Sequence, residues 1–384
     1  MGNPFKPTFG ATPLFLAGRT GLLEEFVDSL DNGPGSPGRA TIYTGARGTG
    51  KTVMLNEAED LARKRGWIVV SETATPGFLS RLVQEHLPRV LQNLLPAQAK
   101  HEVTSITLPL GLGGASRDRL LETAGRPDTF RGLATRICDL LAKQQTGLLV
   151  SLDELHQNQL PELREFALSV QHLFRENREF VFLAAGLPVS VNSIINDDLL
   201  TFLRRSDRHS LGRIPEAEVA DAIQSTFEQS ERSISMDQAV EAAKATVGYP
   251  YLVQLVGFHV WKQNRSNPEV SDDDVTAGID AARRRLGSVV HEAAIADLSE
   301  IDRTFLLAMA QDDGPSKMSD LAGRLTVDTN YASQYRLRLI ANELIESVGH
   351  GMVDFSLPYL RDYLRDHPAL EAQQLAPDRK DVQP

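Results

Sequence analysis

A short glycine-rich segment carries the clearest chemical signal in this sequence. It consists of Gly45, Ala46, Arg47, Gly48, Thr49, Gly50, Lys51 and Thr52 and fits the pattern G-x-x-x-x-G-K-[ST]. In such a segment the glycines let backbone N–H groups curl around a β-phosphate, the lysine reaches the β- and γ-phosphate oxygens, and the threonine hydroxyl ligates Mg²⁺. The segment therefore predicts a phosphate-binding loop (P-loop) for ATP and Mg²⁺, with an ordinary glycine-rich turn as the alternative.

A second candidate group lies about a hundred residues further along, where the mostly apolar residues 148–152 are followed by Asp153 and Glu154. A carboxylate at the end of a strand beside a P-loop is suited to hold Mg²⁺ through water, and we expect this of Asp153. Glu154 would orient and deprotonate the water that attacks the γ-phosphate. The pair predicts ATP hydrolysis, with a purely structural acidic turn as the alternative.

Alternating strand and helix signals surround both candidates. A strand at residues 39–44 precedes the P-loop and a helix at 51–65 follows it. Further strands are predicted at 67–71, 148–152 and 180–185, and further helices at 20–30, 78–95, 129–143 and 162–176. Strands joined through helices need crossover connections, which give a largely parallel sheet covered on both faces.

The strand signals then stop. Helical patterns follow at residues 216–230, 236–247, 251–264 and 272–296, with predicted caps at Pro215 and Ser271. The next segment predicts helices at 301–310, 317–325 and 328–344, the second capped by Ser316, and a hairpin at 345–355. Three helices and a hairpin form the winged helix-turn-helix arrangement.

The predicted fold class is α/β, with three parts. A P-loop NTPase parallel sheet occupies residues 10–213, an all-α lid domain 214–296, and a C-terminal winged helix-turn-helix 297–367, followed by a polar tail at 368–384 that we expect to be disordered. An insertion at 96–128 contains the apolar segment 102–114, which is either a partner surface or a covered hairpin.

The two phosphate-site motifs and three shorter segments resemble the AAA+ ATPases of the origin-recognition type and the related STAND signalling ATPases. The segments are Phe15-Leu16-Ala17-Gly18-Arg19, Thr201-Phe202-Leu203-Arg204-Arg205 and Gly248-Tyr249-Pro250. The resemblance implies that Arg19 and Pro250 approach the nucleotide. It also implies that Arg205, or its neighbour Arg204, is an arginine finger for the γ-phosphate of a neighbouring subunit. A solvated charge cluster is the alternative for these arginines.

The sequence also departs from the family pattern. Thr20 stands where members usually have glutamate, and the strand at 179–187 ends in Ala-Ala-Gly where a polar side chain usually helps to place the attacking water. No arginine follows the glycine of the helical part in the manner of the origin-recognition type. We therefore expect slow hydrolysis, as in a nucleotide-dependent switch.

Composition narrows the class of protein. The 384 residues carry a net charge of −11, with 41% hydrophobic and 24% charged residues, which excludes wholesale disorder and argues against a globally basic nucleic-acid binder. A single cysteine, Cys138, cannot form an intramolecular disulfide and is predicted to lie in the core. No apolar run approaches the length of a membrane span, so we expect a cytoplasmic protein with no membrane partner.

The partner of the predicted winged helix stays open at this point. Its third helix carries Arg336 and Arg338, which are suited to DNA phosphates and base edges. Residues 298–365, however, contain seven basic and ten acidic residues. This net negative charge argues against DNA binding, because DNA-binding domains usually present a basic surface. A protein partner or a second copy of the chain is the alternative.

We expect a Mg·ATP-binding ATPase that acts as a slow switch and relays its nucleotide state to the winged helix. The alternatives are an ATP-regulated DNA-binding regulator or replication initiator, and a STAND-like scaffold that docks protein partners. His156, which follows the acidic pair, is predicted to be a capping or surface residue and not a catalytic base.

Overall fold

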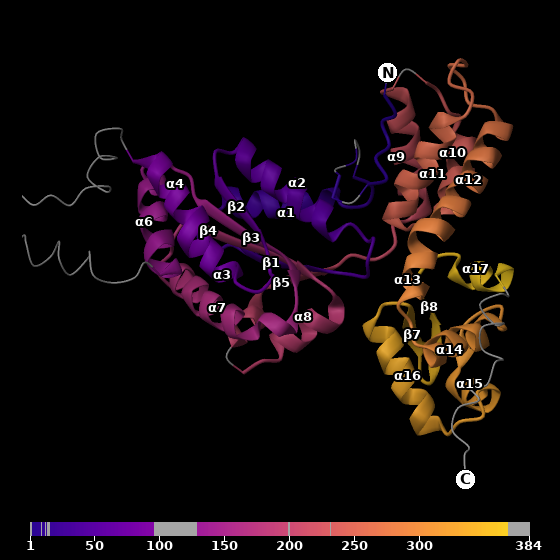
Figure 1. Ribbon diagram of the computed structural model, residues 1–384. Coiled ribbons are helices and arrows are strands. Elements are labelled where there is room, and N and C mark those ends of the chain that lie inside the picture. The colour runs from indigo at the N-terminus through magenta and orange to yellow at the C-terminus, as the bar shows by residue number, and fades with distance from the viewer. Residues whose placement is uncertain are drawn as a thin grey trace, which may run out of the picture. The chain divides into compact units, whose positions relative to one another are not determined.

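The computed structural model describes residues 2–95 except 9, 12, 14 and 15, and residues 129–198, 200–230 and 232–367 (Figure 1). The insertion at 96–128 and the tail at 368–384 lie outside the described residues. The chain divides into two compact units. The sheet unit holds Arg19–Gly45 and Gly50–Leu211, and the helical unit holds the residues up to Gly18, Ala46–Thr49 and those from Gly212 onward.

A five-stranded parallel sheet organises the sheet unit; the sequence predicted a largely parallel sheet and four of these strands, but not β5. Its strands are β1 (Ala40–Thr44), β2 (Ile68–Thr73), β3 (Leu148–Leu155), β4 (Phe180–Gly186) and β5 (Asp207–Ser210), in the spatial order β2-β3-β4-β1-β5. The carboxyl ends of β1 and β3 therefore lie at the same edge of the sheet with β4 between them. This edge is where the P-loop and the acidic pair begin.

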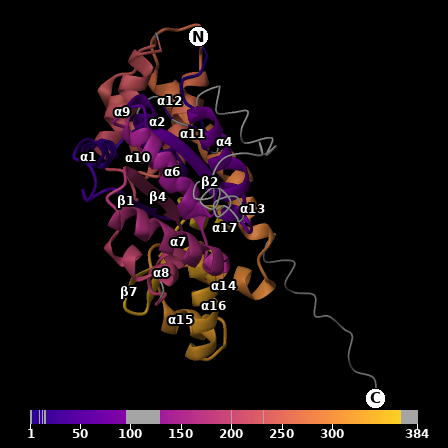
Figure 2. The ribbon, with the colours of Figure 1, turned by 90° about the vertical axis from the view of Figure 1, so that its left-hand side faces the viewer.

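Helices cover both faces of this sheet. The helices α1 (Thr20–Asp31) and α2 (Lys51–Lys64) pack together on one face, and α6 (Phe130–Ala142) and α7 (Leu160–Arg175) pack together on the other (Figures 1 and 2). The second face has an aromatic core, in which the Phe166 ring lies 4.8 Å from Phe130 and 5.3 Å from Phe182, centroid to centroid. The central strands β3 and β4 are buried on both faces and therefore read as nearly continuous apolar runs.

The predicted helix at 78–95 is interrupted. It consists of α3 (Phe78–Arg81), a π-helical turn (Leu82–His86) and α4 (Leu87–Leu94). Pro88 explains the π turn. Its ring clashes with the carbonyl four residues earlier and it has no N–H to donate, so the α-helical hydrogen-bond pattern shifts to a π-helical one. The sheet unit also contains α8 (Pro188–Ile195) and a 3-10 turn (Thr201–Arg205), which the sequence analysis did not predict.

The first part of the helical unit contains the predicted helices. They are α9 (Glu216–Glu228), α10 (Met236–Thr246), α11 (Pro250–Lys262) and α12 (Asp272–Leu286), and a π turn (Gly287–His291) joins α12 to α13 (Glu292–Ala296). Ser271 caps α12 by accepting from the Asp274 N–H, as predicted. Pro215 makes no side-chain cap, since proline offers no side-chain acceptor.

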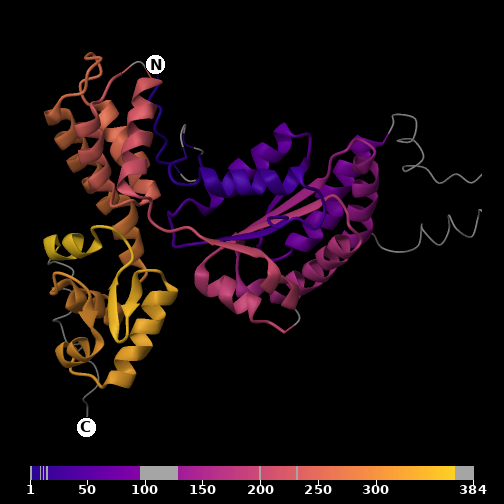
Figure 3. The ribbon, with the colours of Figure 1, turned by 180° about the vertical axis from the view of Figure 1, so that it is seen from behind.

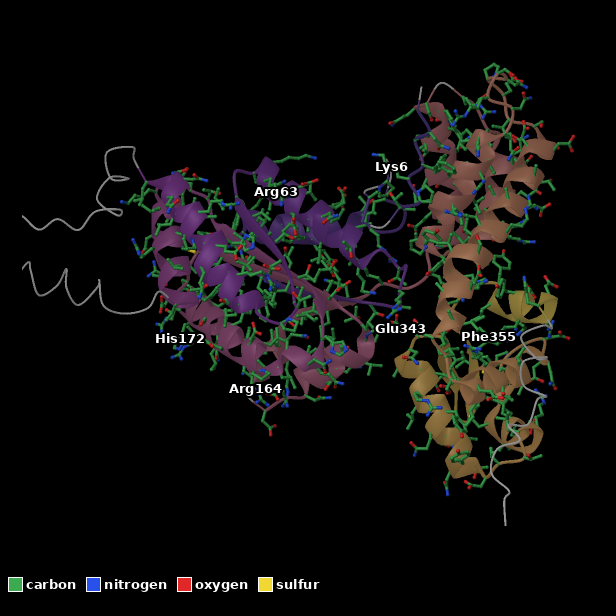
Figure 4. The ribbon with its side chains drawn as sticks, viewed as in Figure 1. Lys6, Arg63, Arg164, His172, Glu343 and Phe355 are labelled. Atoms are coloured by element: carbon green, nitrogen blue, oxygen red, sulfur yellow. The ribbon has the colours of Figure 1, made fainter. Side chains whose placement is uncertain are left out.

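The remaining residues combine helices with a small sheet. The elements are α14 (Glu300–Ala310), β6 (Ser316–Lys317), α15 (Met318–Arg324), α16 (Thr329–Ala341), β7 (Ile345–Gly349), β8 (Met352–Phe355) and α17 (Leu360–Asp366). The strands are antiparallel in the order β6-β8-β7, and they lie beside these helices (Figure 3). Phe355, at the end of β8, points into the core between them (Figure 4). Ser316 lies in β6 and does not cap α15, so that prediction was wrong.

Within the described residues, no helix is both long enough and apolar enough to cross a membrane.

Candidate nucleotide-binding site

The P-loop joins β1 to α2, as its sequence predicted. Gly48 and Gly50 have φ angles of 76° and 88°, in the left-handed region that glycine adopts without a Cβ penalty. Gly50 is the residue that caps α2, and it has no side chain with which to occupy the first N–H groups of the helix. These donors, together with the positive end of the helix dipole, are suited to bind a phosphate group.

The P-loop lysine lies along the loop. Its Nζ donates to the Gly45 carbonyl over 2.8 Å. The Thr49 hydroxyl donates to the Ala46 carbonyl over 2.7 Å and so closes the turn from within. Lys51 is therefore held where a triphosphate in the loop would meet its ammonium group.

The two halves of the expected metal site come together although they are separated by about a hundred residues. The Thr52 hydroxyl donates to Oδ2 of Asp153 over 2.7 Å. A hydroxyl and a carboxylate are hard oxygen donors, and Mg²⁺ typically takes one or two such side chains, several waters and the phosphates of its nucleotide. The Thr52 hydroxyl and the Asp153 carboxylate therefore fit the Mg²⁺ that the sequence predicted.

Glu154 has an unusual backbone conformation. Its φ is 57°, in the left-handed region that non-glycine residues rarely enter, and the pairing of β3 with β4 is irregular between Leu152 and Leu155. The Glu154 N–H donates to Oδ1 of Asp153 over 2.8 Å, which fixes the carboxylate from the other side. Such outliers cluster at functional sites, but the sequence offers no signal that would have predicted this one.

His156 has the capping role that the sequence predicted. Its Nδ1 accepts from the Asn158 N–H over 3.3 Å, at the start of the 3-10 turn Gln157–Gln159. Cys138 is buried in the core as predicted, and burial raises the pKa of its thiol to about 12. Neither side chain contributes to the nucleotide-binding site.

The end of β4 offers no polar side chain to the site. Ala184 and Ala185 are buried, and a Cβ on Gly186 would lie 2.9 Å from Val191 and 3.0 Å from Leu155. A larger residue at Gly186 would therefore force its neighbours apart. The glycine that replaces the usual polar residue is required by packing in this chain.

The two arginines proposed for a finger have different surroundings. Arg204 donates from Nε to the Ile195 carbonyl over 3.0 Å and from Nη2 to the Asn196 carbonyl, so it caps the carboxyl end of α8. Arg205 is exposed and makes no ion pair or hydrogen bond within the described part of the chain. Arg204 is therefore engaged by α8, and the finger role of Arg205 stays a prediction.

The residues implied by the family resemblance are placed as follows. Phe15 lies outside the described residues, and Arg19 is the residue that caps α1 in the sheet unit. Pro250 is the first residue of α11 in the helical unit. Gly248 has a φ of 67°, and a Cβ there would lie 2.3 Å from the Ile214 carbonyl oxygen. This close approach explains the glycine of Gly-Tyr-Pro.

The tip of the P-loop, Ala46–Thr49, belongs to the helical unit and has two contacts there. The Tyr249 hydroxyl donates to the Arg47 carbonyl over 2.8 Å, and burial raises the pKa of this tyrosine. The Arg47 N–H donates to Oε2 of Glu343 over 3.0 Å; Glu343, labelled in Figure 4, follows α16. The Gly-Tyr-Pro motif marks Tyr249 in the sequence but does not reveal this contact, and nothing near Glu343 in the sequence points to a role.

The two arginines proposed to contact DNA are engaged within the helical unit. Arg338 donates from Nη2 to Oδ1 of Asp302 over 2.6 Å, and that carboxylate is buried. Arg336 donates from Nη2 to the Ser347 hydroxyl over 3.0 Å. Asp302 is brought to Arg338 only by the tertiary fold, so the sequence shows no sign of this pairing. DNA contact by either arginine stays a prediction.

Comparison with known proteins identifies the architecture. Residues 16–184 match the AAA ATPase domain family, and residues 288–364 match a domain of unknown function (DUF8462). A Walker-type ATPase of Pyrococcus abyssi is 15% identical, with a TM-score of 0.59, and the match covers 91% of this chain and 96% of that one. The ORC2 protein of Aeropyrum pernix, solved in ADPNP–ADP complexes, is 15% identical, with a TM-score of 0.56 and coverage of 96% and 98%. No curated protein was found to match this sequence.

At this level of identity the solved structures show likeness of fold, while the family match covers the P-loop and the acidic strand directly. The parallel sheet, the P-loop before α2 and the Thr52–Asp153 contact agree with both comparisons. We conclude that residues 16–184 match an AAA ATPase domain and that the chain has a fold like that of these solved ATPase structures.

Proposed function

We propose that this protein binds Mg·ATP at the P-loop, hydrolyses it slowly and acts as a nucleotide-dependent switch that relays its state to a C-terminal winged helix. The observation that carries the proposal is the 2.7 Å contact between the Thr52 hydroxyl and the Asp153 carboxylate. It joins the last residue of the P-loop to the strand-end acid, as a shared Mg²⁺ would require.

Each residue of the site has one role in this proposal. Lys51 neutralises the β- and γ-phosphates, and the N–H groups at the start of α2 bind phosphate oxygens. Thr52 and Asp153 hold Mg²⁺, which offsets the negative charge that develops on the phosphoryl oxygens. Glu154 accepts a proton from the attacking water, and its constrained backbone limits the directions its carboxylate can take.

Slow hydrolysis follows from what the site lacks. The packing around Gly186 leaves no room for a polar side chain there, so in this proposal Glu154 orients the water without a polar side chain from the end of β4. General-base catalysis contributes about 10²–10⁴-fold, while precise positioning of the nucleophile contributes more. We therefore expect a turnover well below the median enzyme value of about 10 per second. A finger from a neighbouring subunit, Arg205, would raise it.

The relay rests on the helical unit. We assign residues 214–296 as the lid and 297–367 as the winged helix, in which β7 and β8 form the wing. Arg47 supports the coupling, because its N–H belongs to the P-loop and donates to Glu343. A phosphate group in the loop would compete with that carboxylate for the same donor, so nucleotide binding would change a contact of the winged helix.

Protein docking is the second candidate role of the winged helix, and one observation favours it over DNA binding. Tyr331 and Leu337 on α16 and Val348 on β7 are 49%, 58% and 47% exposed, whereas Arg338 is paired with Asp302. Exposed apolar side chains are typical of protein interfaces. DNA readers usually present a basic surface.

A titration with duplex DNA tests which of these two partners the winged helix takes. The full-length chain and the Arg336→Ala/Arg338→Ala variant are titrated at several salt concentrations, with and without ATP. DNA binding predicts a steep salt dependence in the wild type, reduced by about one to two units of slope in the variant. If the wild type binds no duplex at low salt, the winged helix is a protein-docking module.

A further inference from the structure

A separate cleft lies in the sheet unit, away from the P-loop. It has a volume of about 280 Å³ and lies between α1, the loop that follows it, and the strands β1 and β5. None of the residues that line it belongs to the P-loop or to the acidic pair at Asp153. The nucleotide-binding site therefore leaves this cleft without a function.

The walls of the cleft are fixed by buried contacts. Gly38 has a φ of 86°, and a Cβ there would lie 2.9 Å from Cβ of Ser29, so the loop lies directly against the helix. Arg39, 2% exposed, donates from Nε to the Ser29 carbonyl and from Nη2 to the Leu30 carbonyl. Its Nη1 also pairs with Glu179 over 2.7 Å. The cleft is thus preorganised and does not depend on loop closure.

Two aromatic rings, Tyr43 and His209, and the side chain of Thr41 line the cleft at the sheet. The Tyr43 and His209 rings are stacked, with centroids 5.9 Å apart. Tyr43 is 1% exposed, and its hydroxyl makes no hydrogen bond to any residue that the structure describes. The hydroxyl oxygen itself is not fully enclosed, so it opens onto the cleft, where water or a ligand can hydrogen-bond to it. A ligand that brings a hydrogen-bonding group into the cleft would therefore find a partner in this residue.

The charge of the cleft is strongly negative. Glu25, Asp28 and Asp207 line it, and none of them forms an ion pair within the described residues. No described group of three or more His, Cys, Asp or Glu side chains is arranged to hold a metal ion, so these carboxylates do not form a metal site. Carboxylates at the mouth together with ring faces attract an organic cation with an aliphatic chain.

We propose that this cleft binds an aliphatic polyamine of the size of spermidine. One ammonium group donates to Asp207 and to the Tyr43 hydroxyl, the alkyl chain lies along Leu22 and Phe26, and the other ammonium groups meet Glu25 and Asp28 at the mouth. This ligand supplies what the cleft lacks, namely positive charge and hydrogen-bond donors. The inference does not depend on the proposed ATPase function.

Isothermal titration of the full-length chain with spermidine, without nucleotide and at about 150 mM salt, tests the proposal. We expect saturable binding of one spermidine per chain and no binding of 1,8-octanediol, a neutral chain of similar length. Asp207→Asn should weaken binding about tenfold, since it removes a charge-assisted hydrogen bond. Tyr43→Phe, which keeps the ring and the fold, should weaken it about threefold.

Glu24→Gln is the matched control, because Glu24 is exposed on α1 and does not line the cleft. It removes the same charge and should leave the affinity unchanged. Absence of saturable binding by the wild type would overturn the proposal. So would equal weakening by Glu24→Gln and Asp207→Asn, which would mean that spermidine binds the acidic chain without a site. Should Asp207→Asn fail to fold, the Tyr43→Phe comparison decides.

Discussion

Replacing Asp153 by alanine separates the metal-dependent part of nucleotide binding from the rest of the site. The Thr52 hydroxyl donates to this carboxylate over 2.7 Å, so the variant removes one of the two oxygen donors assigned to Mg²⁺ and leaves Lys51 and the P-loop intact. An interaction with a charged group contributes about 1.5–3 kcal/mol, and each 1.4 kcal/mol is a factor of ten in affinity. We therefore expect Mg·ATP to bind about ten- to a hundredfold more weakly.

The assay is calorimetric titration with ATP in Mg²⁺ and again in excess EDTA. Wild-type affinity should fall when Mg²⁺ is removed, whereas the affinity of Asp153→Ala should be nearly the same in both buffers. Asp60→Ala is the control, since Asp60 is an exposed carboxylate on α2 that pairs with Arg63. If Asp153→Ala keeps the full Mg²⁺ dependence of the wild type, the assignment of this carboxylate to the metal is refuted.

Three further predictions address hydrolysis, assembly and pH. Glu154→Gln should keep ATP affinity and lose about a hundredfold or more in phosphate release, the contribution expected of a general base; an unchanged rate would show that another group activates water. Arg205→Ala should slow hydrolysis without changing ATP affinity, and the wild-type rate per subunit should rise with protein concentration. A wild-type hydrolysis rate per subunit that does not depend on protein concentration would exclude a finger from a neighbouring subunit. Arg204→Ala should instead lower the Tm, because it removes the cap of α8. Burial lowers the pKa of His291 to about 4, below its ordinary value of about 6.5, so the folded state is most stable when this histidine is neutral. The free energy of unfolding should therefore be highest above pH 6.5 and fall by at most about 3 kcal/mol as the pH drops towards 4. In chemical denaturation, His291→Gln should flatten this pH dependence of stability.

The local parts of this protein could be predicted from its sequence. The apolar strand before Gly45, the glycines of the P-loop and the helix after Lys51 are consecutive in the chain, so their pattern specifies the geometry directly. The Thr52–Asp153 contact was also predictable, because parallel strands bring their carboxyl ends to one edge of the sheet. The capping role of His156 followed from its place after a strand.

Features that depend on neighbours far away in the sequence could not be predicted. Strand β5 consists of four polar residues at the edge of the sheet, so it lacks the apolar run by which the buried strands were recognised. The capping role of Arg204 depends on α8, which was not predicted, and the pairing of Arg338 depends on Asp302, 36 residues earlier. The left-handed backbone of Glu154 coincides with the irregular pairing of β3 with β4, which the sequence does not reveal.

Nucleotide binding by the P-loop is the central claim, and titration of the full-length chain and of Lys51→Ala with Mg·ATP tests it most directly. Lys64→Ala, which removes an exposed lysine from the other end of α2, is the matched control. The wild type and Lys64→Ala should bind one ATP per chain with equal affinity, and Lys51→Ala should show no measurable binding while its Tm stays that of the wild type. Unchanged ATP affinity in a folded Lys51→Ala protein would contradict the account.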